Sequence, residues 1–136
     1  MYIVFAILSA ASAALVAVFG KIGLSKVDTT LATAIRAVVM AVLLVLAAAI
    51  LKKWDLSQIS SKAYLFIFLS GVAGATSWLC YFLALKFGPA TSVAAIDRLS
   101  VVFVLVLAAL FLGEPLTPKS VFGGMLLVLG ALLLVK

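Results

Sequence analysis

Three charged residues stand inside long apolar stretches of the sequence and are its strongest candidates for chemistry. Arg36 lies about eight residues into the stretch 29–51, and Asp97 and Arg98 lie about six residues into 92–113. A charge near the centre of a bilayer costs about 2.5–3.5 kcal/mol or more, so it usually faces a partner or a water-filled cavity. At a rise of about 1.5 Å per residue, all three groups fall in one layer roughly 10 Å below one membrane face, where an Arg36–Asp97 pair is sterically feasible.

Polar and aromatic side chains of the neighbouring stretches fall in the same layer. The stretch 63–87 runs the other way and offers Ser77, Trp78 and Tyr81 at this depth, and Thr33 lies one helical turn before Arg36. Polar faces that meet inside a helical bundle are the usual form of a small-molecule site. We therefore predict a substrate or ion pathway lined by Arg36, Asp97, Arg98, Ser77, Trp78, Tyr81 and Thr33.

Each of these residues also has a purely structural interpretation. The long side chains of Arg36 and Arg98 can extend to the lipid headgroups, and Trp78 and Tyr81 are ordinary packing residues in many proteins. Asp97 is too short to reach the headgroups, which favours an ion pair or a functional role. The sequence has no histidine, no glycine-rich phosphate loop and no paired acids at helical spacing. We therefore expect no catalytic residues, no metal site, no cofactor and no enzymatic activity.

The composition predicts an all-α integral membrane protein that positions these side chains. Hydrophobic residues make up 68% of the 136 residues, and the mean hydropathy is +1.44. A soluble domain is usually about 45–50% apolar, and a membrane-spanning helix needs about 20 mostly apolar residues. We predict a single domain over residues 1–136, with five transmembrane helices at about 2–24, 29–51, 63–87, 92–113 and 120–135.

Local signals support these boundaries. Asp28 is placed to cap the second span, and Gly88-Pro89 should end the third. Trp54 and Tyr64 are placed where aromatic side chains meet the membrane interface. Five glycines, which allow helices to approach closely, are predicted to serve helix packing or dimerisation: Gly71, Gly74, Gly123, Gly124 and Gly130.

The net charge of +6 comes from lysines scattered through short loops, which favours lipid headgroups over nucleic acid as the partner. An odd number of spans places the termini on opposite faces. One face then has four lysines, Lys52, Lys53, Lys62 and Lys119, and the other has four, Lys21, Lys26, Lys86 and Lys136. This tie either reflects chance in a small protein or indicates that the chain inserts both ways and pairs antiparallel with itself.

Several residues in order resemble one EamA repeat of the drug/metabolite transporter superfamily. They are Lys21, Arg36, the aromatic run 78–86, the stretch Leu-Phe-Leu-Gly-Glu-Pro-Leu-Thr at 110–117, and the glycines of the fifth span. The resemblance covers all five spans and is closest to the single-repeat bacterial and archaeal type. It implies a multi-pass protein of a prokaryotic cytoplasmic membrane. Where many such repeats have an apolar stretch with a proline, this chain has Ile-Asp-Arg-Leu-Ser at 96–100. That departure makes Asp97 a candidate for proton or ion coupling.

The resemblance and the charged layer together predict a secondary transporter, and more specifically an exporter, of a small organic metabolite or drug-like molecule. It would work by alternating access in an antiparallel homodimer, with Arg36 holding an anionic group or Asp97. Two alternatives stay open at this point. One is a membrane assembly or accessory protein without transport, and the other is a flippase for a lipid-linked group.

Overall fold

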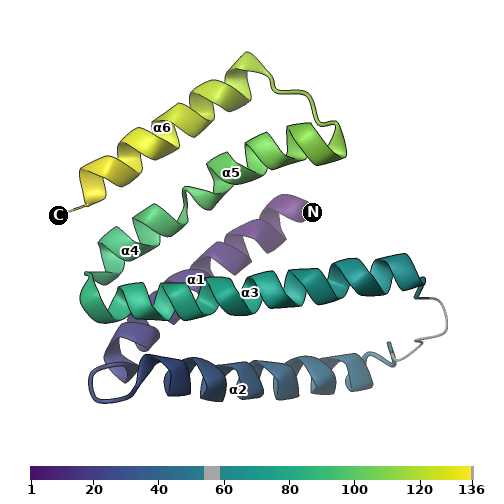
Figure 1. The fold of residues 1–136 in the computed structure, drawn as a ribbon, viewed down its shortest axis with the longest axis vertical. Helices are drawn as coiled ribbons and strands as arrows, with labels where there is room; N and C mark the ends of the chain where they lie inside the picture. The colour runs from purple at the N-terminus through teal and green to yellow at the C-terminus, as the bar shows by residue number, and fades with distance from the viewer. Residues whose placement is uncertain (54–58, 136) are drawn as a thin grey trace. The chain divides into compact units, whose positions relative to one another are not determined.

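A computed structural model describes residues 1–53 and 59–135, and the described chain is helical apart from its connections (Figure 1). Trp54 and Lys136, which entered the predictions above, lie outside the described residues. The helices are α1 (Tyr2–Gly23), α2 (Thr29–Ile50), α3 (Ser61–Phe87), α4 (Ala90–Asp97), α5 (Ser100–Leu107), the π-helical turn η1 (Ala108–Leu112) and α6 (Pro118–Leu134).

The chain divides into two compact units, which we describe separately. One comprises Met1–Lys21 with Phe87–Lys136, and the other comprises Ile22–Lys86. In the part of the chain that the structure describes, four helical segments are long and apolar enough to cross a membrane, namely α1, α2, α3 and the run Ala90–Leu112. The last helix, α6, has 17 residues and so measures about 26 Å, against a hydrocarbon core of about 30 Å. Four of the five predicted spans are thus confirmed in length, and the crossing by α6 stays a prediction.

Large apolar side chains cover the outside of these helices. Phe5, Leu44 and Phe111 are 65%, 66% and 80% exposed, and they lie on different spans. Helices satisfy their backbone hydrogen bonds internally, so an apolar exterior is stable in lipid, which does not compete for those bonds. Few side chains are buried, and Leu85 is the largest fully buried side chain among the described residues.

The predicted fourth span is interrupted rather than continuous. α4 ends at Asp97, and the next turn tightens, because the Leu99 N–H donates to the Ile96 carbonyl at 2.9 Å and the Val101 N–H donates to the Arg98 carbonyl at 3.1 Å. Such bonds to the third preceding residue replace the usual bonds to the fourth. The sequence has no proline or glycine here. The interruption falls on a polar cluster, and aspartate and serine are weak helix formers.

The end of this span and the start of α6 follow from identifiable residues. Gly113 adopts φ +69°, the left-handed conformation that glycine tolerates at a helix C-terminus, and the Glu114 N–H returns to the Ala108 carbonyl at 3.2 Å. Thr117 and Ser120 then form a reciprocal capping box with Pro118 in the first turn of α6.

In the unit that comprises Met1–Lys21 and Phe87–Lys136, α6 runs back along α4 and α5 (Figure 1). The buried Ser92 hydroxyl of α4 donates to the Leu134 carbonyl at 2.9 Å. Gly124 is buried, and a Cβ there would lie 3.2 Å from Leu105 Cδ1. A Cβ on Gly123 would meet nothing within 4 Å. The two adjacent glycines therefore differ, since only Gly124 packs inside the chain.

Gly124→Val is expected to destabilise the fold by about 1–3 kcal/mol, because the added methyl groups would overpack the contact with Leu105. Gly123→Val carries the same β-branched side chain into space that is open within the chain, so it is the matched control when both variants are compared as monomers. Unfolding of both variants in mixed micelles, followed by circular dichroism as sodium dodecyl sulfate is added, measures the difference. Equal losses in the two variants would contradict the close packing at Gly124.

In the other unit α2 begins as the sequence predicts. The Asp28 side chain accepts hydrogen bonds from the Thr30 and Leu31 N–H groups at 2.9 and 3.1 Å, which confirms it as the N-cap. Thr29 and Thr33 are buried on one face of α2, and the Thr33 hydroxyl donates to the Thr29 carbonyl at 2.7 Å. The face of α2 that carries Thr29 and Thr33 is therefore buried.

The Asp28 cap predicts a pH dependence in the acid range. Hydrogen bonds from the backbone of Leu31 and Thr30 lower the pKa of the Asp28 carboxyl below its usual value of 3.8. A lowered folded-state pKa stabilises the fold fully above the unfolded pKa, and this stabilisation is lost as the pH falls through the folded pKa. Asparagine caps helices equally well but does not titrate there. As micelle samples are acidified from neutral pH, we expect the natural protein to lose more of its free energy of unfolding than Asp28→Asn loses. Parallel curves would contradict the prediction.

Candidate functional site

Arg36 of α2 makes a cation–π contact with Trp78 of α3. The central carbon of the Arg36 guanidinium lies 3.5 Å from the centroid of the Trp78 ring and 5.5 Å from that of Phe82. A cation over an aromatic face is attracted by the negative charge density of the ring, and the planar guanidinium also stacks on it. The side chain of Arg36 is therefore held against α3 at this point.

Two aromatic rings of α3, Trp78 and Phe82, lie against Arg36, and the Tyr81 ring packs beside both of them. The Trp78 ring meets Tyr81 edge-on at 5.5 Å between centroids and lies 6.0 Å from Phe82. These residues follow Trp78 by three and four positions, so they share one helix face. Phe82 is only 4% exposed and was not among the predicted site residues. Its spacing of four from Trp78 is the sequence signal that would have found it.

The nitrogen atoms of Arg36 make no hydrogen bond or ion pair within the described part of this unit. A guanidinium has five N–H donors in its plane and no acceptor. The aromatic contact occupies a face of the group and leaves those in-plane donors available. The side chain is neither buried nor fully exposed. Within the described residues of its unit, Arg36 therefore presents unpaired donors inside an apolar span.

Other predicted residues of this unit lie differently. Thr33 is buried and its hydroxyl already donates within α2. Ser77, next to Trp78 but about 100° around the helix, is exposed and makes no hydrogen bond in the described residues. A Cβ on Gly71 or Gly74 would meet nothing within 4 Å, so their role in close helix packing stays a prediction.

In the other unit, Asp97 and Arg98 lie at the interruption between α4 and α5. Both side chains are exposed and form no ion pair or hydrogen bond in the described residues of that unit. Because the Val101 N–H donates to Arg98, the Asp97 carbonyl also loses its usual donor. Asp97 thus presents acceptor oxygens from its side chain and its backbone together. The predicted Arg36–Asp97 pair joins residues of two units and stays a prediction.

Lys21, which the sequence placed only near the end of the first span, makes a specific contact. Its ammonium group donates to the Gly88 carbonyl at 2.9 Å in a half-buried position. Gly88 directly follows the last residue of α3, where backbone carbonyls lack donors and favour a cation. The lysine in the last turn of α1 and the Gly88-Pro89 stop are the sequence signals for this contact.

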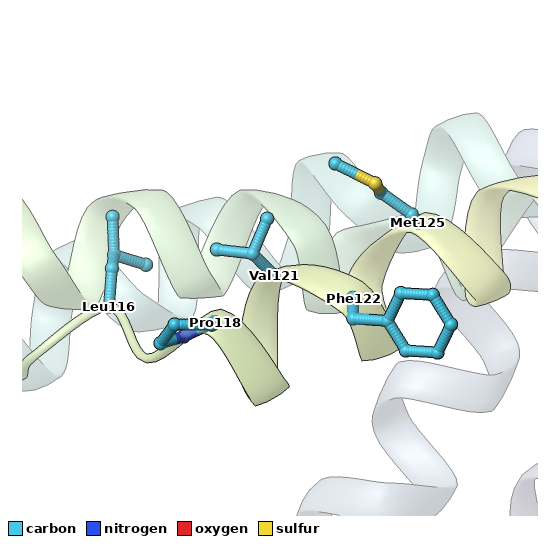
Figure 2. A pocket seen from close by; sticks show the side chains of 5 residues that line it. All are labelled: Leu116, Pro118, Val121, Phe122 and Met125. Carbon is cyan, nitrogen blue, oxygen red and sulfur yellow. The ribbon is translucent and has the colours of Figure 1, made fainter.

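A shallow hollow of about 380 Å³ lies along the start of α6, in the unit that also contains α4 and α5 (Figure 2). It is lined by Leu116, Pro118, Val121, Phe122 and Met125. These side chains offer no polar group that could orient a polar ligand, in contrast to the surroundings of Arg36. The hollow suits lipid chains rather than a selective site.

Comparison with known proteins places these observations in a family. The model of the EamA-like transporter family matches residues 1–136. The chain belongs to the EamA-like transporter family. It is 45% identical over 130 residues to an uncharacterized transporter in the cobO 3' region of Sinorhizobium sp., covering 95% of this chain and 92% of that relative.

A second similarity covers only part of the chain. The Pseudopaline exporter CntI of two Pseudomonas aeruginosa strains is 39% identical over 71 residues, which are 52% of this chain and 25% of the exporter. No solved structure matches the chain. The resemblance drawn from the sequence is confirmed, and this family member is a multi-pass membrane protein related to transporters.

Proposed function

We propose that this chain is one half of a secondary transporter that exports a small organic molecule across the cytoplasmic membrane of a prokaryote. Family membership supports transport, and so does the 45% identity to an uncharacterized transporter of Sinorhizobium. The exporter from Pseudomonas supports the outward direction. A site at Arg36 is supported by one observation: its guanidinium lies inside an apolar span and has no hydrogen-bond or ion-pair partner in the described residues of its unit.

The active form proposed here is an antiparallel homodimer. Asp97 and Arg98 are exposed within a span, where contact with lipid would cost about 2.5–3.5 kcal/mol for each charge. A second copy and the aqueous cavity it encloses remove that contact. Gly123, whose surroundings are open, lies on a face of α6 that would admit a neighbouring helix closely. The tied lysines permit both orientations of the chain.

The proposed cycle is alternating access around a central site. In many secondary transporters two inverted repeats rock about a site near the membrane midplane, and two inverted copies of this chain would supply those repeats. Arg36 would hold an anionic group of the substrate, while Trp78 and Tyr81 shape the pocket. Asp97 would take up and release the proton that couples transport.

Flux measurements in proteoliposomes test this function. Purified protein is reconstituted, and counterflow of labelled organic anions, cations and neutral solutes is compared with that in protein-free vesicles. We expect saturable counterflow of at least one class, reduced in Arg36→Gln. Folded, reconstituted protein that moves none of them would overturn the transporter proposal and favour an accessory role, in which Arg36 and Asp97 affect only assembly.

The dimer is tested by topology. Two C-terminal reporters, one active only in the cytoplasm and the other active only outside it, are both expected to be active when fused to this chain. A uniform orientation would exclude the antiparallel homodimer and require a separate inverted partner or a parallel assembly.

A further inference from the structure

We infer that Arg36 and Trp78 form a carboxylate-binding subsite, so that the transported molecule is a singly charged organic carboxylate. The inference rests on the proposed function for transport, but binding at the subsite can be measured without it. It is drawn from three observations in one unit: the stack on Trp78, the missing acceptors around Arg36, and the charges of α2 and α3.

The stack determines which part of the guanidinium is left for a ligand. With the central carbon 3.5 Å from the Trp78 centroid, one face of the group is covered by the ring. The donors lie in the plane of the group, perpendicular to that contact, and have no acceptor within the described part of the unit. A ligand that binds here therefore accepts hydrogen bonds at the guanidinium edge.

The geometry of that edge selects a planar acceptor. Two parallel N–H groups of a guanidinium match the two oxygens of a carboxylate, and such bidentate pairs are shorter and stronger than neutral hydrogen bonds. Neutral amides and esters offer one carbonyl oxygen and no charge. The subsite should therefore distinguish a carboxylate from its own amide, which has nearly the same shape.

The charge count selects a single negative charge. α2 contains no other charged side chain, and in α3 the lysines are confined to the first and last turns, at Lys62 and Lys86. One carboxylate neutralises Arg36, whereas a doubly charged phosphate would leave an uncompensated charge within the span. Uncompensated charge away from water is strongly unfavourable. The subsite therefore favours carboxylates over phosphate monoesters.

The aromatic support also lowers the cost of binding. Trp78 is itself held by Tyr81 edge-on at 5.5 Å and by Phe82 at 6.0 Å. A long arginine side chain that is already ordered loses less freedom when it binds a ligand. The partly exposed ring of Tyr81 also gives the rest of the molecule an aromatic surface beside the carboxylate, which benzoate can use and acetate cannot.

Trp78 provides the readout for the test. The chain has two tryptophans, Trp54 and Trp78, so Trp54→Phe leaves Trp78 as the single tryptophan, which is excited selectively over the three tyrosines at the red edge of its absorption. The variant protein in lipid nanodiscs is titrated with acetate, benzoate and phenylacetate, with the corresponding amides, and with phenyl phosphate. We expect a saturable change in Trp78 emission with benzoate or phenylacetate, no change with the amides, and weaker binding of phenyl phosphate.

Arg36→Lys should raise the Kd about tenfold or more, because lysine keeps the positive charge but lacks the two parallel N–H donors of the guanidinium. Arg36→Gln loses both the charge and the paired donors, so it should weaken the response further than Arg36→Lys does.

Three outcomes would overturn the subsite. They are no response to any carboxylate, equal responses to acid and amide, and an undiminished response in Arg36→Gln with native helix content by circular dichroism. Counterflow of the same compounds separates this inference from the proposed function. Carboxylate binding without flux would remove the transporter proposal and leave the subsite, and flux without preference for carboxylates would do the reverse.

Discussion

Asp97→Asn is expected to abolish the accumulation of substrate that a proton gradient drives, while exchange of substrate across the membrane continues. Of the carboxylates in the described residues, Asp28 caps α2 and Glu114 follows η1, so only Asp97 lies within a predicted span. Its carboxylate has no partner in its own unit, and it lies where α4 is interrupted. A group that carries a proton across must be able to lose it, and asparagine cannot.

The size of the effect follows from the driving force. A gradient of one pH unit supplies about 1.4 kcal/mol per proton, which corresponds to roughly tenfold accumulation of a solute moved with or against one proton. In proteoliposomes we therefore expect about tenfold accumulation for the natural protein and none beyond equilibrium for Asp97→Asn. Exchange without a gradient needs no net proton movement and should survive the substitution.

Two further variants identify the cause. Glu114→Gln removes a carboxylate of the same charge outside the spans and should leave accumulation unchanged. Asp97→Glu keeps a titratable group and should restore part of the coupling. If Asp97→Asn transports with the same rate and the same pH dependence as the natural protein, Asp97 has no coupling role and its charge serves helix pairing alone.

The break beside Asp97 shows where sequence reasoning stops. The bounds of α1, α2 and α3 were predicted to within about two residues, because each is an apolar run that ends at a polar cap or at Gly88-Pro89. The fourth span is equally apolar overall, and it contains no proline or glycine before Gly113. The interruption arises because N–H groups around Arg98 donate to the third preceding carbonyl instead of the fourth. The hydropathy of the sequence does not predict which of these two hydrogen bonds forms.

The site shows a similar division. Counting residues along helices of known rise placed Arg36, Trp78 and Tyr81 in one layer, and the structure brings Arg36 onto the Trp78 ring. Depth alone does not determine rotation about the helix axis. Ser77 has the same depth as Trp78 but lies exposed, and Phe82, one turn further on, completes the aromatic surface. Rotation is set by packing between helices, for which a single sequence provides little information.

Arg36→Gln is expected to lower the rate of flux at low substrate concentration about 10- to 150-fold. A hydrogen bond to a charged group contributes about 1.5–3 kcal/mol, and about 1.4 kcal/mol corresponds to a factor of ten. Trp78→Leu should have the smaller effect of about 2- to 30-fold, because a cation–π contact is worth roughly 0.5–2 kcal/mol. It acts through the position of Arg36, so it should raise KM more than it lowers kcat.

A double-mutant cycle tests whether Trp78 acts by positioning Arg36 or contacts the substrate independently. If Trp78 acts by holding Arg36, the double variant Arg36→Gln with Trp78→Leu should be no slower than Arg36→Gln alone, since the ring then has no guanidinium to position. Phe66→Leu is the matched control, because it makes the same kind of change at a side chain of α3 that is 59% exposed. Additive losses in the double variant would mean that Trp78 contacts the substrate independently. The pocket would then be built from both side chains rather than from an arginine oriented by its aromatic support.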